Sequence, residues 1–338
     1  MYRYISATLV AALACLFICP DCFAQSLPAE KQAEVAFQID MERLRGTPMY
    51  DMISANIEQM QAQTGMSSDF DWKDVNKMFG AMSLPETVAE FEEMQNGEVL
   101  NLDMFVRVQF VDSAAAEKLM TEIREEGVET EIDGQTYYSP PEDADMPPGI
   151  LATLVDDKTF EMGTEAYVRG GTGSGLFSNG LTSAWDSMPE DAIRIAIDID
   201  SARDLINEAV EMVQETAPPP SGTMVALVTK ANNIRFSMDF KDGNLMTLAA
   251  TGTDEDSAEE LRSGLDGILG MAKFGAGQGI EQMRQQDEQL ADVMTQILDA
   301  LTATRDADQV QVVIPRPDGF EDAMEKLMEM SGMGGSDF

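Results

Sequence analysis

The placement of cysteine most constrains how this chain can fold. All three cysteines lie at the start, at positions 15, 19 and 22. The segment that contains them has the order of a secretory signal peptide: Arg3, an apolar stretch from Ile5 to Ile18, and small residues at Cys22 and Ala24. Cleavage after Ala24 leaves a mature chain without cysteine. Such a chain forms no disulfide bond, so we expect an apolar core alone to stabilise it.

This leader predicts a protein of the periplasm or the extracellular space. A lipoprotein signal is the alternative, with Cys15 or Cys19 as the lipidated residue. Apolar residues continue past Cys15, however, and Ile18 is large for the position before Cys19. After residue 24 the apolar runs are short pieces such as residues 224–228, far below the length of a membrane span.

The charge excludes several classes of function. The chain has 61 acidic and 22 basic residues and no histidine, which gives a net charge of −39. Removal of the leader takes away Arg3 and Asp21, so the mature chain keeps this charge. A surface this acidic is unsuited to nucleic acids or anionic lipids. Without histidine there is no imidazole base, no Ser-His-Asp triad and no histidine-ligated metal.

The hydrophobic pattern alternates between strand-like and helix-like segments, so the fold class expected is α+β with antiparallel, hairpin-connected sheets covered by helices on one face. The expected strands are 35–40, a strand within 99–111, 128–132, 135–138, 151–155, 159–162, 192–199, 223–229, 233–240, 245–252 and 310–314. The expected helices are 48–62, 72–79, a helix capped by Asp112, 201–214, a helix opening at Ser257, 280–304 and 320–330. The stretch 84–95 has helical spacing but precedes an Asn-Gly turn, and we favour a strand for its last part.

The two halves of the mature chain resemble each other. Val35 to Asp40 matches Ile195 to Asp200, and Arg43 falls on Arg203. The expected organisation is a signal peptide (1–24), a first α+β unit (25–170), a glycine-containing connector (171–191), a second α+β unit with C-terminal helices (192–330) and a flexible tail (331–338).

Two further segments carry a family resemblance. Leu44 to Pro48 leads from the first strand into a helix, and Asp157 to Thr164 precedes the second unit. With the leader, this pattern resembles uncharacterised bacterial exported proteins of duplicated α+β design. The resemblance has no catalytic signature and implies no activity for any residue.

Two glycine-rich runs were considered as phosphate loops. Arg169 to Gly175 lacks the lysine that a Walker A loop needs, which favours a connector. Gly275 to Gly279 follows an expected helix and not a strand, so we interpret it as a break between two helices.

Aspartates are the main candidates for chemistry. Asp198 and Asp200 share one face of an expected strand, with Asp40 at the matching place in the first half, and such a pair can hold Ca²⁺ or act as acid and base. The simpler interpretation has Asp200 capping the next helix beside Arg203. For Asp69, Asp71 and Asp74 around Trp72 we also favour the start of a helix over a metal site.

Methionine is abundant, with 25 residues. Met324, Met328, Met330 and Met333 form a C-terminal cluster, and thioethers bind Cu(I). Met49, Met52 and Met60 instead fall on an apolar helix face, where methionine serves packing.

We therefore expect a non-enzymatic binding or scaffolding protein of the periplasm or cell envelope. The alternatives are a carboxylate-based or Ca²⁺-dependent hydrolase using Asp198 and Asp200, and a methionine-based copper binder. No catalytic, cofactor-binding or metal-binding residue and no cofactor is assigned. The expected partner is an unidentified protein or a cationic molecule, and the acidity also suits a salty habitat. The oligomeric state stays open.

Overall fold

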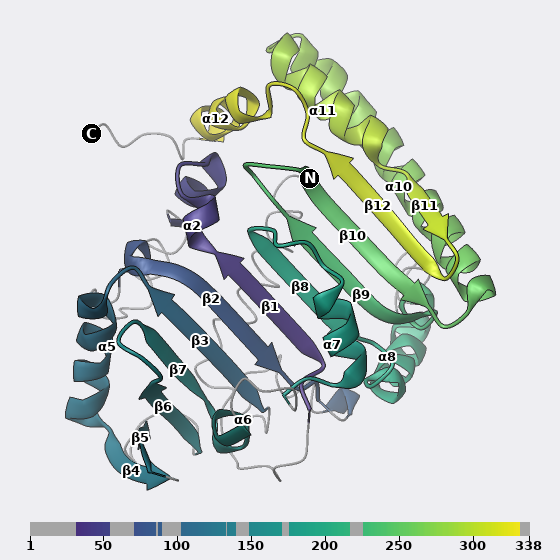
Figure 1. Ribbon diagram of the computed structural model, residues 1–338. Coiled ribbons are helices and arrows are strands. Elements are labelled where there is room, and N and C mark those ends of the chain that lie inside the picture. Colours follow the sequence, from purple (N-terminus) through teal and green to yellow (C-terminus); the bar gives the residue numbers. More distant parts are fainter. Residues whose placement is uncertain are drawn as a thin grey trace.

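A computed structural model describes residues 32–54, 71–85, 87–89, 103–132, 134–139, 149–170, 176–216 and 226–331. Within these ranges the chain is α+β, built on one antiparallel sheet of twelve strands in the order β11-β12-β10-β9-β8-β1-β2-β3-β7-β6-β5-β4 (Figure 1). The strands are β1 (Val35–Asp40), β2 (Val75–Met82), β3 (Met104–Phe110), β4 (Val128–Ile132), β5 (Gln135–Ser139), β6 (Ile150–Leu154), β7 (Thr159–Thr164), β8 (Ile193–Asp198), β9 (Ala231–Met238), β10 (Asn244–Gly252), β11 (Ala303–Asp306) and β12 (Gln309–Pro315).

The helices connect or flank these strands. They are α2 (Met41–Leu44), the 3₁₀ turn η1 (Trp72–Asp74), α5 (Ser113–Glu126), α6 (Glu165–Gly170), α7 (Asn179–Asp186), α8 (Arg203–Thr216), α10 (Glu255–Arg284), α11 (Glu288–Ala300) and α12 (Phe320–Ser331). Residues 48–54 are also helical, and Thr47 Oγ1 accepts the N–H of Tyr50 at 3.3 Å, as the expected start at Thr47 requires. No helix in the described ranges is long and apolar enough to cross a membrane.

The strands assigned to the two halves form a single sheet, because β1 pairs with β8 at its centre. Val35 lies opposite Ile197 and Ile39 opposite Ile193, in antiparallel register. Outward from this pair the order is β1-β2-β3-β7-β6-β5-β4 on one side and β8-β9-β10-β12-β11 on the other. The strands from β1 to β6 and those from β8 to β11 follow the same pattern of hairpins and crossovers, and β5 and β4 extend the first side. A common origin of the halves stays a prediction.

Helices lie on both faces of the sheet, and not on one as we expected. Alternation along β1 shows this: Phe37 and Ile39 belong to the core shared with α5, α11 and α12, while Ala36 belongs to the core shared with α6 and α7. Near the edge of the sheet formed by β11, strands β10 and β12 pack against α10. The face that carries α6 and α7 has the polar strand residues and positions the candidate site.

The two edge strands are short and charged. β4 pairs with β5 and carries the exposed Glu129 and Glu131, and β11 pairs with β12 and carries Arg305 and Asp306. Charged side chains on short edge strands discourage pairing with another chain. Edge-to-edge growth of the sheet is therefore disfavoured.

Five local expectations were wrong. The segment expected as a helix over 72–79 forms only η1 and then enters β2, because β2 bonds along its length to both β1 and β3. Residues 226–228, expected in a strand, are helical. Helix α10 starts after Asp254, whose carboxylate accepts the N–H of Ser257, so Ser257 is not the cap. The same helix also continues through Gly275–Gly279 to Arg284. The helix expected over 280–304 is therefore divided, because Asp287 caps a new helix, α11, and residues 303–306 pair with β12 as strand β11.

Other expectations fall on parts of the chain that the structure does not describe. These are the leader, most of residues 84–102, and residues 171–175 of the glycine-rich run. The remainder of the expected connector contains a helix that we did not expect, α7.

Candidate functional site

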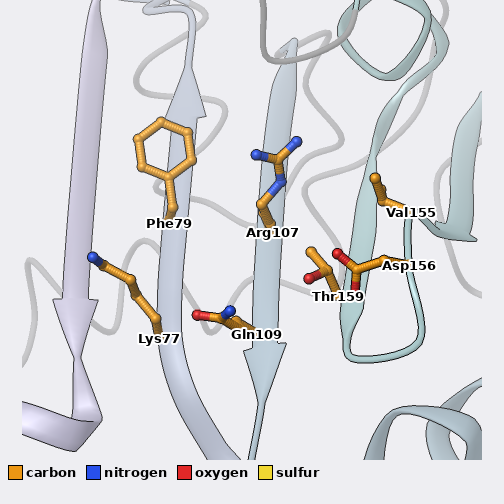
Figure 2. A pocket seen from close by; sticks show the side chains of 7 residues that line it. All are labelled: Lys77, Phe79, Arg107, Gln109, Val155, Asp156 and Thr159. Atoms are coloured by element: carbon orange, nitrogen blue, oxygen red, sulfur yellow. The ribbon is translucent and has the colours of Figure 1, made fainter. Parts of the chain in front are cut away.

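A pocket of about 480 Å³ lies on the polar face of the sheet, over β2, β3 and the turn between β6 and β7 (Figure 2). We call it the sheet pocket, and its lining residues are Lys77, Phe79, Arg107, Gln109, Val155, Asp156 and Thr159. Period-two alternation explains the set, since Lys77 and Phe79 share one face of β2, and Arg107 and Gln109 share the same face of β3. Its size suits a small organic molecule.

The two cations of the sheet pocket each have a carboxylate neighbour. Lys77 Nζ lies 3.7 Å from Asp40 Oδ2. Arg107 donates from Nε to Glu161 Oε1 at 2.6 Å, and its Nη2 contacts the same oxygen. Glu161 is buried in β7, directly opposite Arg107 in the register. Glu161, beside Arg107 on the neighbouring strand, therefore fixes the position of the guanidinium.

Asp156 adds an anionic group to the sheet pocket, on the side formed by the turn between β6 and β7. Its Oδ1 accepts the backbone N–H of Lys158 at 2.8 Å, within the tight turn between β6 and β7. This backbone hydrogen bond is the main reason why the pKa of Asp156 lies below its ordinary value. The carboxylate is therefore ionised at neutral pH, and Figure 2 shows it beside Thr159.

Phe79 connects the sheet pocket to an aromatic cluster under α7. Its ring centroid lies 5.6 Å from that of Trp185 and 5.9 Å from that of Phe177. Trp185 in turn lies under the guanidinium of Arg194, which is 4.2 Å from the ring centroid. A molecule in contact with Phe79 would therefore be separated from the fluorescent ring of Trp185 only by the ring of Phe79.

Asp198 and Asp200, which we considered as a catalytic or cation-binding pair, have separate structural roles. Asp198 is buried, and its Oδ1 accepts the N–H groups of Asp200 and Ser201 at 3.1 and 3.3 Å. Its Oδ2 accepts the hydroxyl groups of Ser201, at 2.7 Å, and of Ser178. Asp200 pairs with Arg203 at 2.8 Å, so the expected neighbour is confirmed. The oxygens of Asp198 bind the turn before α8 and not the helix itself.

The remaining candidates are placed as follows. Asp40 caps α2 by accepting the N–H of Arg43 at 3.0 Å. Asp71 caps η1, which includes Asp74, whereas Asp69 lies outside the described residues. Met49, Met52 and Met324 pack in the core. Met60, Met333 and the side chains of Met328 and Met330 are not described. In the described part of the chain, no three acidic side chains gather in a way that could hold a metal ion.

Sequence reasoning missed the sheet pocket. The pattern of β3 does contain a signal, because Arg107 and Gln109 are polar positions in a segment that is otherwise apolar. This alternation marks one polar face, but it does not reveal which strands lie beside it. The long-range pairing of β3 with β7, more than fifty residues later in the chain, was needed to place Asp156 and Thr159.

No family model and no curated protein matches the sequence. Among solved structures the chain is similar to TP0453. Crystal form IV of TP0453 is 9% identical with a TM-score of 0.37, over 92% of this chain and 97% of that one. Crystal form I is 10% identical with a TM-score of 0.38, over 91% and 96%. The likeness is distant, and nothing about function follows from it.

Proposed function

We propose that this chain is an exported, non-enzymatic binding protein that holds a small polar molecule in the sheet pocket. The observation that supports this is that Lys77, Arg107 and Asp156 line one pocket together with the ring of Phe79, on the polar face of the sheet. An apolar surface with a few charged groups in fixed places is the usual composition of a ligand site.

Binding is favoured over catalysis because two buried carboxylates, Asp198 and Glu161, are engaged in the fold. Asp198 accepts four hydrogen bonds from its surroundings, and Glu161 is bound to Arg107. A general base or a metal ligand needs free lone pairs directed at a substrate. Since the chain also lacks histidine, few groups are left for acid-base chemistry.

The charges of the sheet pocket indicate a zwitterion or a neutral molecule as the ligand. Lys77 and Arg107 are matched by Asp40 and Glu161, and Asp156 adds one negative charge. A ligand with a carboxylate toward the two cations and an ammonium group toward Asp156 pairs with both signs. A purely anionic ligand would in addition be repelled by the net charge of −39. We therefore propose molecules of the free amino-acid type.

Fluorescence of Trp185 tests this proposal. The chain has two tryptophans, so Trp72→Phe leaves Trp185 as the sole reporter. In this background we would titrate phenylalanine, glutamate and arginine, three zwitterions with different side chains. We expect at least one to change the emission of Trp185 in a saturable manner, because Phe79 is in contact with its ring.

Two variants and one control assign the response to the pocket. Lys77→Met and Asp156→Asn should each weaken binding at least about tenfold, since each removes one charge partner. Lys241→Met, in the exposed turn before β10, should leave it unchanged. If none of the three amino acids changes the emission at millimolar concentration, the proposed ligand class is wrong.

Export is tested separately, by the N-terminus of the mature chain. Mass spectrometry of the protein from the periplasm or the medium should give a chain that starts at Gln25. A chain that keeps Met1, or a lipid-modified Cys15 or Cys19, would contradict cleavage after Ala24.

A further inference from the structure

Helix α10 has an exposed apolar pair on its outer surface. Phe274 is 80% exposed and Met271 is 56% exposed, and the two lie one helical turn apart. No Asp or Glu occurs from residue 267 to residue 280, in a chain of 61 acidic residues. An exposed phenylalanine on a stretch of helix without carboxylates is typical of a contact surface.

Several glycines of α10 are not explained by packing within the described part of the chain. Gly264 has a clear reason, since a Cβ there would lie 2.4 Å from the side chain of Leu227. A Cβ at Gly267, Gly270 or Gly277 would meet nothing within 4 Å. Glycine in a helix interior is less favourable than alanine, so these three positions destabilise the helix without a local benefit. Glycine at these positions would be explained if the backbone of another molecule approached the helix closely there, because a larger side chain would then clash with it.

We propose that α10 pairs in antiparallel orientation with α10 of a second copy of this chain. A set of exposed and partly exposed residues on one side of α10 has alternating spacings of three and four, as in a helix pair, and we call it the stripe. The stripe consists of Glu260, Ser263, Gly267, Gly270, Phe274, Gly277, Glu281 and Arg284.

This stripe is complementary to itself when one copy is reversed. With Phe274 of one copy opposite Gly270 of the other, Gly267 lies opposite Gly277, and the large ring meets a position without a side chain. In the same register Glu260 lies opposite Arg284. A two-fold axis repeats each of these contacts, as in a symmetric dimer.

The charges of the stripe favour the same partner. Two molecules of charge −39 repel each other, and this repulsion is least where carboxylates are absent. The ends of the stripe bring Glu260 and Arg284 of different copies together. Within one copy Glu260 pairs with Lys230 at 2.6 Å and Arg284 with Asp292 at 2.6 Å, so the contacts between copies would extend existing ion pairs.

Sedimentation velocity of the purified protein over a range of protein and salt concentrations tests the proposal. We expect a monomer-dimer equilibrium that shifts toward dimer as salt screens the repulsion. Phe274→Ser should weaken dimerisation at least about tenfold. Val128→Ser, at a 52% exposed apolar residue on β4, is the matched control and should leave it unchanged. A chain that stays monomeric at millimolar concentration and high salt overturns the proposal.

Two glycine variants separate the dimer contact from helix stability. Gly270→Ala should raise the melting temperature of the monomer, because alanine favours the helix, and yet weaken the dimer by crowding Phe274 of the partner. Gly279→Ala lies off the stripe and also meets nothing within 4 Å, so it should raise the melting temperature alone. Equal effects of the two variants on dimerisation would contradict the contact.

A charge exchange tests the antiparallel register. Glu260→Lys and Arg284→Glu should each weaken the homodimer, since like charges then face each other twice. Mixing the two variants should restore dimers, because both contacts of the mixed dimer have opposite charges. If the mixture dimerises no better than either variant alone, the proposed register is wrong. The stripe and the substituted residues contain no lining residue of the sheet pocket. The dimerisation experiments can therefore succeed or fail independently of the ligand-binding proposal.

Discussion

Arg194 and Asp198 lie on the same face of β8 and contact opposite ends of helix α7. Asp198 accepts the hydroxyl of Ser178, the N-cap of the helix, and Arg194 donates to the carbonyl oxygen of Trp185 near its C-terminus at 2.8 Å. Four residues of strand span about 13 Å, and the eight residues of α7 span about 12 Å. The anion is therefore at the positive end of the helix dipole and the cation at the negative end.

Removal of the charge of Asp198 should destabilise the fold. Asp198→Asn replaces an oxygen that accepts two hydroxyl groups by an amide that cannot accept them. We expect the free energy of unfolding to fall by about 2–3 kcal/mol, measured by urea denaturation. Asp200→Asn is the matched control, because Asp200 forms an exposed pair with Arg203, and it should change this free energy by less than about 0.5 kcal/mol. Equal losses in the two variants would show that Asp198 has no special role.

Gly180→Ala tests how closely α7 approaches β8. In a free helix alanine is favoured over glycine by about 1 kcal/mol. At this position, however, the new Cβ would lie 2.5 Å from Oδ2 of Asp198. We expect the clash to dominate and the protein to lose about 1–3 kcal/mol of stability. Thermal unfolding should therefore shift down, and an upward shift would mean that α7 can move away from the strand at no cost.

Arg194→Lys tests the contact between the cation and the ring. The guanidinium lies 4.2 Å from the centroid of Trp185, and burial lowers the pKa of Arg194. Lysine keeps the charge but lacks the planar group, so we expect a loss of about 1–2 kcal/mol. In the Trp72→Phe background the emission of Trp185 should change as well. Arg262→Lys, at an arginine whose partners Glu259 and Asp266 are other residues of α10, should cause neither the loss of stability nor the change in emission.

Asp239 should make stability depend on pH in the acid range. Burial alone would raise its pKa, but the N–H groups of Lys241 and Asp242 and the guanidinium of Arg43 lower it below the ordinary value. A group with a lowered pKa stabilises the fold fully above its unfolded pKa of about 3.9. That contribution is lost as the pH falls through the lower, folded value.

Asp239→Asn removes this titration. At neutral pH we expect the variant to be less stable by about 2–4 kcal/mol, because Arg43 and Arg316 lose their shared anion. The difference between the two proteins should shrink below about pH 4. Urea denaturation at a series of pH values measures it, and a difference that stays constant down to pH 2 would contradict the assigned cause.

Local patterns predicted the elements whose stabilising contacts are also local. Asp112 accepts the N–H of Ala115 and caps α5 as expected. The hairpin of β4 and β5 and that of β9 and β10 lie where the turns at Gly134 and Gly243 indicate, and both glycines have positive φ. The prediction of a helix over 72–79 was wrong because most of that segment forms β2, which bonds to two strands distant in the sequence, β1 and β3. The spacing of apolar residues within the segment contains no information about those strands.

The sequence by itself determined the α+β class, the cap of α5, the hairpins β4-β5, β6-β7 and β9-β10, and the acidic character of the surface, because each depends on neighbouring residues or on composition. Only the tertiary structure decided that β1 and β8 join the halves into one sheet, that Asp198 serves α7, and that Lys77, Arg107 and Asp156 surround one pocket. The physical reason is that hydrogen bonds between strands and the burial of charge link residues far apart in the chain. The periodicity of a single segment shows which face is polar, but not what that face will meet.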